Sequence, residues 1–136
     1  MNEIKQIATE LNCSYIHDDF ARINLLADKV THYPLIAETL PTDGEIICTH
    51  APAMTATKNV IVCFLTPCNF DFTGHEASDK ISEMLELAQR FIVKYCALHG
   101  VDVPARLRYN AVLDFMDYNL CGVRVSLTTT TPLNCK

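Results

Sequence analysis

Residues 60–65, VIVCFL, form the longest apolar run in the chain. Odd and even positions are apolar alike, a pattern typical of a strand whose two faces are both buried. The run is far shorter than the roughly 18 apolar residues that a membrane-spanning helix requires. We therefore expect the central strand of a sheet at residues 57–66.

A long amphipathic helix is predicted downstream of this strand. Apolar residues recur at intervals of three and four over about five turns, as on the buried stripe of a helix. They are Ile81, Met84, Leu85, Ala88, Phe91, Ile92 and Tyr95. Thr73 and Glu76 have the spacing of a capping box, with Ser78 as a competing N-cap. Gly100 can end the helix in the left-handed conformation.

The N-terminal half of the chain combines one short helix with several extended segments. Ile4, Ile7, Ala8 and Leu11 have helical spacing, which predicts a short helix that ends near Asn12. Turn residues then separate further predicted strands at 23–27, 34–39 and 45–50. The Tyr33-Pro34 step should lie at the beginning or edge of a strand, because proline has no N–H to donate.

After Pro104 the apolar pattern has a period of two, with a slip at residues 111–112 that indicates a bulge. Val123, Val125 and Leu127 then alternate with polar residues, which predicts a last strand. The connection at residues 117–119 is short enough to make strands 106–115 and 120–130 an antiparallel ribbon. Residues 128–136 either extend this ribbon or fray.

These elements predict one α+β domain over residues 1–136, with a mostly antiparallel sheet packed against one long helix and a short N-terminal helix. The chain has 136 residues, of which 49% are hydrophobic and 20% charged, as in ordinary globular domains. No linker or internal repeat divides it.

Net charge indicates the class of partner, and the expected location indicates the redox state of the cysteines. The formal net charge is −5, whereas proteins that bind nucleic acid carry clustered Lys and Arg, so nucleic acid is not expected as the main partner. No secretory signal or membrane span is expected, and we predict a cytoplasmic location. The seven cysteines, an odd number, are then expected to be reduced.

Several residue groups resemble catalytic or metal sites. Cys63, Cys68 and His75 are zinc-type ligands, but a second close pair would need the distant Cys96 and His99. We therefore expect no metal site and a buried, reduced Cys63.

A thiol nucleophile at Cys48 would need His50, two residues along the same strand, to lower its pKa, and no oxyanion element accompanies them. The paired carboxylates lie where turns and helix starts commonly place acidic residues. These pairs are Asp18 with Asp19, Asp71 with Glu76, and Asp114 with Asp117. Standard phosphate-binding and hydrolase motifs are absent. We expect no catalytic residue and no cofactor.

Scattered turn and strand motifs give the chain a resemblance to a known class. They are Asn24-Leu25 with Asp28, residues 33–36 (YPLI), residues 64–67 (FLTP) with 70–72 (FDF), and residues 117–123 (DYNLCGV). With these motifs the chain resembles small phage and prophage tail proteins of the tail-terminator or tail-completion class. The resemblance implies a non-enzymatic structural protein that joins copies of itself into a ring, at the end of a tail or at the head-to-tail junction. It transfers no functional residue.

The predicted function is therefore assembly through self-association, with other tail or neck proteins as further partners. Before incorporation into a virion, such a protein lies in the host cytoplasm. An apolar face and an open strand edge place the candidate self-association surface on the last strand. Its residues are Arg124, Val125, Ser126, Leu127 and Thr128. The alternative is a small module that holds a ligand or peptide between helix and sheet.

Overall fold

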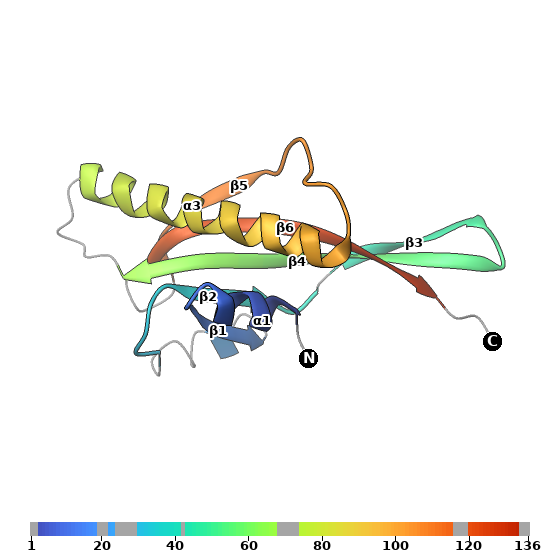
Figure 1. Cartoon of the computed structure of the whole chain (residues 1–136), viewed down its shortest axis with the longest axis horizontal. Helices are drawn as coiled ribbons and strands as arrows, with labels where there is room; N and C mark the ends of the chain where they lie inside the picture. Colours follow the sequence, from blue (N-terminus) through green and yellow to red (C-terminus); the bar gives the residue numbers. More distant parts are fainter. Residues whose placement is uncertain are drawn as a thin grey trace.

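The structure is a computed structural model, and it describes residues 3–18, 22–23, 30–41, 43–67, 74–115 and 120–133. The element order is α1 (Glu3–Glu10), β1 (Ser14–Asp18), β2 (Leu35–Thr39), β3 (Asp43–His50), β4 (Ala53–Pro67), α3 (Gly74–His99), β5 (Tyr109–Phe115) and β6 (Leu120–Leu133). The predicted α+β class is confirmed (Figure 1).

The sheet is larger and more mixed than the sequence pattern predicted. Its six described strands follow the order β1-β2-β4-β6-β5, with β3 also paired to β4. The β1–β2 pair is parallel, and the other pairings are antiparallel. The expected central strand is confirmed as β4, which begins four residues earlier than predicted and pairs with three other strands.

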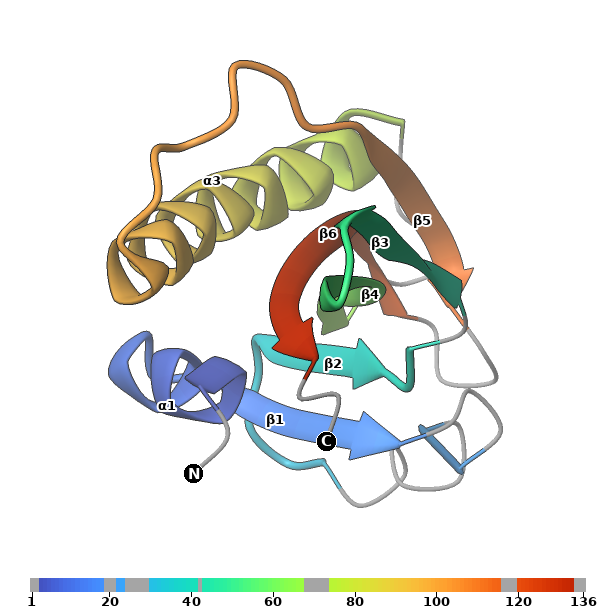
Figure 2. The ribbon, with the colours of Figure 1, turned by 90° about the vertical axis from the view of Figure 1, so that its right-hand side faces the viewer.

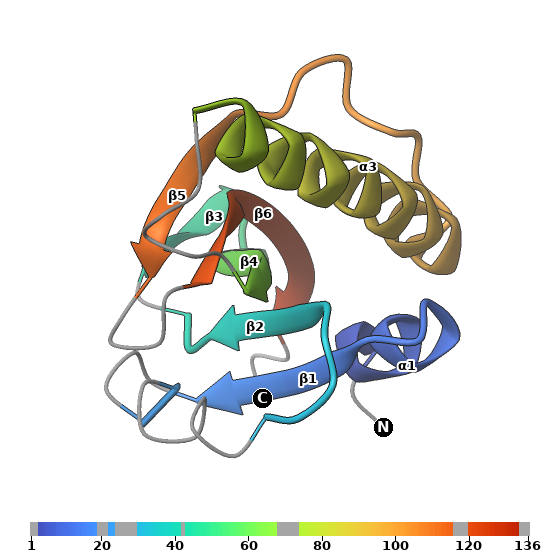
Figure 3. The same ribbon diagram turned by 90° about the vertical axis from the view of Figure 1, so that its left-hand side faces the viewer.

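Core residues lie on both faces of this sheet. On one face, Val62 and Phe64 pack with the buried stripe of α3 and with α1. On the other face, Cys63 and Leu65 belong to a second cluster that includes Ile23. Figures 2 and 3 show α3 above the sheet and α1 beside β1. The apolar run at residues 60–65 is thus buried on both sides because each face has its own cover.

Helices α1 and α3 end in the same way. The N–H of Gly100 bonds to the carbonyl of Ala97, and the N–H of Val101 bonds to that of Cys96, with Gly100 at a φ of 64°. This is a Schellman motif, and it confirms the predicted stop. Asn12 ends α1 with the same pattern at a φ of 59°. The predicted cap residue Thr73 lies outside the described residues.

One further prediction needs correction. The strand expected at 23–27 is wrong at its first residue, because Ile23 is helical, and residues 24–27 lie outside the described part. Pro34 immediately precedes β2, which confirms its predicted place at the beginning or edge of a strand. The bulge in the C-terminal ribbon is present, between Val112 and Phe115.

In the described part of the chain, no helix has the length and apolar character needed to cross a membrane.

Candidate functional site

A three-stranded arm protrudes from the body of the protein (Figure 1). We define the arm as β3, residues 53–59 of β4 and residues 128–133 of β6. It arises because β4 has two successive neighbours on one side: β2 pairs with residues 62–65, and β3 pairs with residues 53–59. On the other side, β6 follows β4 continuously from Met54 to Pro67. All residues of β3 are exposed, and the arm lies outside both core clusters apart from its junction with the body.

The two faces of the arm carry different side chains, and the face that continues toward α3 combines apolar residues with Lys58 and Thr129. Ile46 lies opposite Ala56, and Leu133 lies opposite Met54, on the face that continues toward α3. Ile46 is 66% exposed. The other face carries Asp43, Glu45, Ile47 and a series of threonines, because successive side chains of a strand alternate between faces.

Both outer edges of the arm are open in the described residues. Among the described strands, β3 pairs only with β4, and the pairing of β5 with β6 ends at Val125, so β4 is the only strand paired with residues 126–133 of β6. Such edges present unpaired backbone groups that another strand can use.

The residues predicted to form a self-association surface do not form one common surface. Val125 and Leu127 are buried in the core beneath α3. Arg124, Ser126 and Thr128 are exposed on the opposite face. Thr128 also donates a hydrogen bond from Oγ1 to Oδ1 of Asn59, at 2.9 Å, within the arm. A partner at this strand can therefore reach only the three polar side chains and the open backbone edge.

An apolar groove of about 440 Å³ lies between α3 and the segment 103–109 that leads into β5. Its walls include Ile92, Val103, Leu107 and Tyr109. A smaller hollow of about 260 Å³ adjoins it and shares Ile92, Pro104 and Leu107. Exposed apolar side chains rim the groove, with Val93 at 53%, Val103 at 50% and Tyr109 at 51% exposure.

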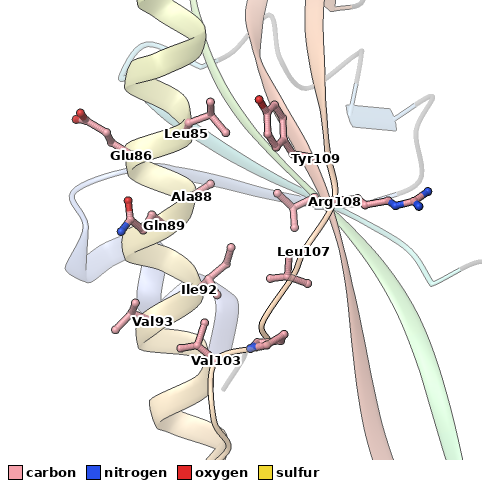
Figure 4. Close-up of a pocket in the computed structure, with 12 residues that line it drawn as sticks. Leu85, Glu86, Ala88, Gln89, Ile92, Val93, Val103, Leu107, Arg108 and Tyr109 are labelled. Atoms are coloured by element: carbon pink, nitrogen blue, oxygen red, sulfur yellow. The ribbon is translucent and has the colours of Figure 1, made fainter.

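The polar residues around this groove do not converge on it. Figure 4 shows Glu86 and Gln89 on the side of α3 away from Leu107, and Arg108 directed away from the helix. A small-molecule site usually places several polar groups toward its ligand to fix its orientation. The groove is therefore better suited to an apolar side chain of a partner than to a polar substrate.

A polar cluster lies where β1 and β2 meet the helices. Glu38 is buried and accepts a hydrogen bond from the hydroxyl of Tyr15, while His17 Nδ1 lies 3.6 Å from Glu38 Oε2. Burial, followed by the carboxylates of Glu3 and Glu38, raises the pKa of Tyr95 to about 12. Ion pairs join α1 to α3 nearby, with His99 Nε2 2.6 Å from Glu3 Oε2. The cluster provides hydrogen-bond partners for buried polar atoms, and of its residues Tyr95 also lines the smaller hollow.

Cys63 and Cys48, the cysteines considered for metal binding and for catalysis, lie in different parts of the fold. Cys63 is buried in the second core cluster, and Cys68 lies outside the described residues. Among the residues that the structure describes, no three His, Cys, Asp or Glu side chains are grouped as metal ligands. Cys48 and His50 are both exposed on the arm, with a bulge between Ile47 and His50.

One or both members of each carboxylate pair lie outside the residues whose side chains are described. Asp18 makes an ion pair with Arg22, at 3.0 Å.

The cysteines should differ strongly in reactivity. Burial raises the pKa of the Cys63 thiol to about 12, so its reactive thiolate is scarce at pH 8, whereas Cys48 is exposed. We expect an alkylating reagent to label Cys48 rapidly in the folded protein and Cys63 only after unfolding, as followed by mass spectrometry. All seven thiols should titrate in denaturant without a reductant. Equal labelling rates for Cys48 and Cys63, or fewer than seven thiols, would contradict this.

Sequence reasoning missed the arm, the groove and the polar cluster. The sequence signals were weak: polar residues at 55 and 57–59 and a glutamate inside the predicted strand 34–39, while the apolar residues of the groove resemble ordinary core residues. Comparison with protein-family models and with curated protein sequences found no match to this chain.

Proposed function

We propose that this chain is a non-enzymatic structural protein that assembles with copies of itself into a ring, at the end of a phage tail or at the head-to-tail junction. The arm is the observation that carries the proposal. It exposes every residue of β3, including Ile46 and Ile47, and it presents two open edges. An exposed, partly apolar ribbon of this kind suits a segment that becomes buried when subunits associate.

The resemblance to tail-terminator and tail-completion proteins supports the same function. It implies that other tail or neck proteins are further partners and that the chain lies in the host cytoplasm before incorporation into a virion. The net charge of −5 favours protein partners over nucleic acid.

Light scattering and sedimentation over a concentration series test the proposal. We expect wild-type protein to associate into a species of uniform size, because a ring closes at a fixed number of subunits. Arg124→Glu places a reversed charge on the exposed polar face of β6 and should weaken association. Lys80→Glu makes the same charge change near the start of α3 and serves as the control. A chain that stays monomeric up to its solubility limit would contradict the proposal.

Thr128→Pro is a poor probe of edge pairing, although an open edge at this strand makes it an obvious choice. Thr128 lies opposite Asn59, and its side chain bonds to that residue. Proline at this position would remove the hydroxyl as well as a backbone donor, so it would disturb the arm itself.

A ligand- or peptide-binding module is the second candidate, and the groove beside α3 favours it. Its volume of about 440 Å³ falls in the range of small-molecule pockets. Saturable binding of an apolar ligand by a chain that never self-associates would support this function instead.

A further inference from the structure

The outer strand of the arm has two chemically different sides. Ile46 projects on the face that continues toward α3, whereas Asp43, Glu45 and Ile47 project on the opposite face. Within the described residues, neither carboxylate makes an ion pair. The backbone edge of β3 between these faces is open.

The segment beside the groove has the complementary arrangement. Leu107 and Tyr109 line the groove, while Arg108 points to the other side (Figure 4). Arg106, two residues earlier, is also exposed, and neither arginine has an ion-pair partner in the described part of the chain. The next strand, β5, pairs only with β6, so its outer edge is open among the described strands.

The arm cannot fill the groove of its own chain. Residues 53–59 are held between β3 and β6, and β4 continues without interruption into the centre of the sheet. The arm extends past the end of α3 at His99, whereas the groove lies along residues 85–93 of that helix (Figure 1). Folding back would break the pairing of β4 with β6, so the occupant must come from another molecule.

We propose that β3 of one copy lies along residues 106–109 of a second copy, with Ile46 in the groove beside α3. This inference rests on the proposed function and specifies its interface. The acidic residues Asp43 and Glu45 then lie on the side to which Arg108 points, so the apolar contact of Ile46 and a charged contact form together. The open edges of β3 and of the receiving segment supply backbone hydrogen bonds, as in strand addition to a sheet edge.

The contact is heterologous, because arm and groove are different surfaces of the same chain. Each subunit gives its arm to one neighbour and receives an arm from the other. Such head-to-tail contacts produce rings when the rotation closes. The contact therefore gives the uniform assembly that the proposed function requires.

Two single variants and their mixture test the docking. Ile46→Glu disables the arm and Val103→Glu disables the groove, and both positions are exposed, so the fold should persist. Each should weaken self-association about tenfold or more, as expected for loss of a central apolar contact. Leu98→Glu changes a similarly exposed residue of α3 outside both hollows, and it should have no effect.

The mixture gives the sharper result. An Ile46→Glu chain has an intact groove, and a Val103→Glu chain has an intact arm, so the two should form a 1:1 dimer that grows no further. A dimer of this kind also shows that both variants are folded. In a separate cycle, Arg108→Glu should weaken association, and adding Glu45→Arg to the same chain should restore it.

The possible outcomes test the proposed interface and the proposed function separately. If wild-type chains associate and neither Ile46→Glu nor Val103→Glu changes this, self-association stands and the arm-to-groove contact is overturned. If the two variants fail to dimerise on mixing, the heterologous mode is overturned. A wild-type chain that remains monomeric at every concentration overturns both.

Discussion

Replacing Phe91 by alanine should lower the free energy of unfolding by about 3–5 kcal/mol. The Phe91 side chain is fully buried in the cluster between α3 and the sheet. Its ring meets Phe64 of β4 edge-on at a centroid distance of 5.2 Å and stacks with Tyr95 at 5.9 Å. Alanine would leave a cavity and remove both aromatic contacts, whose geometry contributes beyond the buried area.

Urea unfolding followed by circular dichroism measures this loss. Glu86→Ala, on the exposed side of the same helix, is the control and should change the free energy of unfolding by less than about 0.5 kcal/mol. Similar small losses for both variants would mean that α3 is not packed on the sheet through Phe91.

The elements that the sequence predicted well are those specified by local pattern. The stripe from Ile81 to Tyr95 has the helical period, and Gly100 supplies the left-handed residue that a Schellman stop requires. The alternation of Val123, Val125 and Leu127 likewise predicted a strand with one buried face, and all three are buried.

Strand partners were harder to predict because they depend on residues far apart in the chain. Nothing in β4 marks the point where its neighbour changes from β3 to β2, so the arm was not expected. Similarly, β1 is parallel to β2, and the chain that connects them carries no clear crossover pattern. Period-two alternation reports which face is buried but not the direction of the adjacent strand.

The candidate site was missed for a related reason. The groove joins residues of α3 to residues 103–109, and each of its apolar side chains resembles an ordinary core residue in the sequence. Only the tertiary structure shows that Val93 and Val103 remain exposed. The buried Glu38 was also missed, because its partner Tyr15 belongs to a different strand.

Gly122→Ala should cost about 3 kcal/mol or more, at the upper end of the losses caused by overpacking. Gly122 lies opposite Leu65 in the pairing of β4 with β6. A Cβ atom at this position would overlap the carbonyl oxygen of Phe64, which is backbone and cannot rotate away. The substitution therefore has to displace one of the two strands on which the sheet and the arm depend.

Gly100→Ala is the matched control, since it adds the same methyl group where nothing lies within 4 Å. Its φ of 64° is unfavourable for alanine, so we expect a loss of only about 1 kcal/mol, reduced further in Gly100→Asn. Thermal and urea unfolding of the three variants separate backbone overlap from conformational strain. Equal losses for Gly122→Ala and Gly100→Ala would show that β6 does not approach β4 as closely as the structure has it.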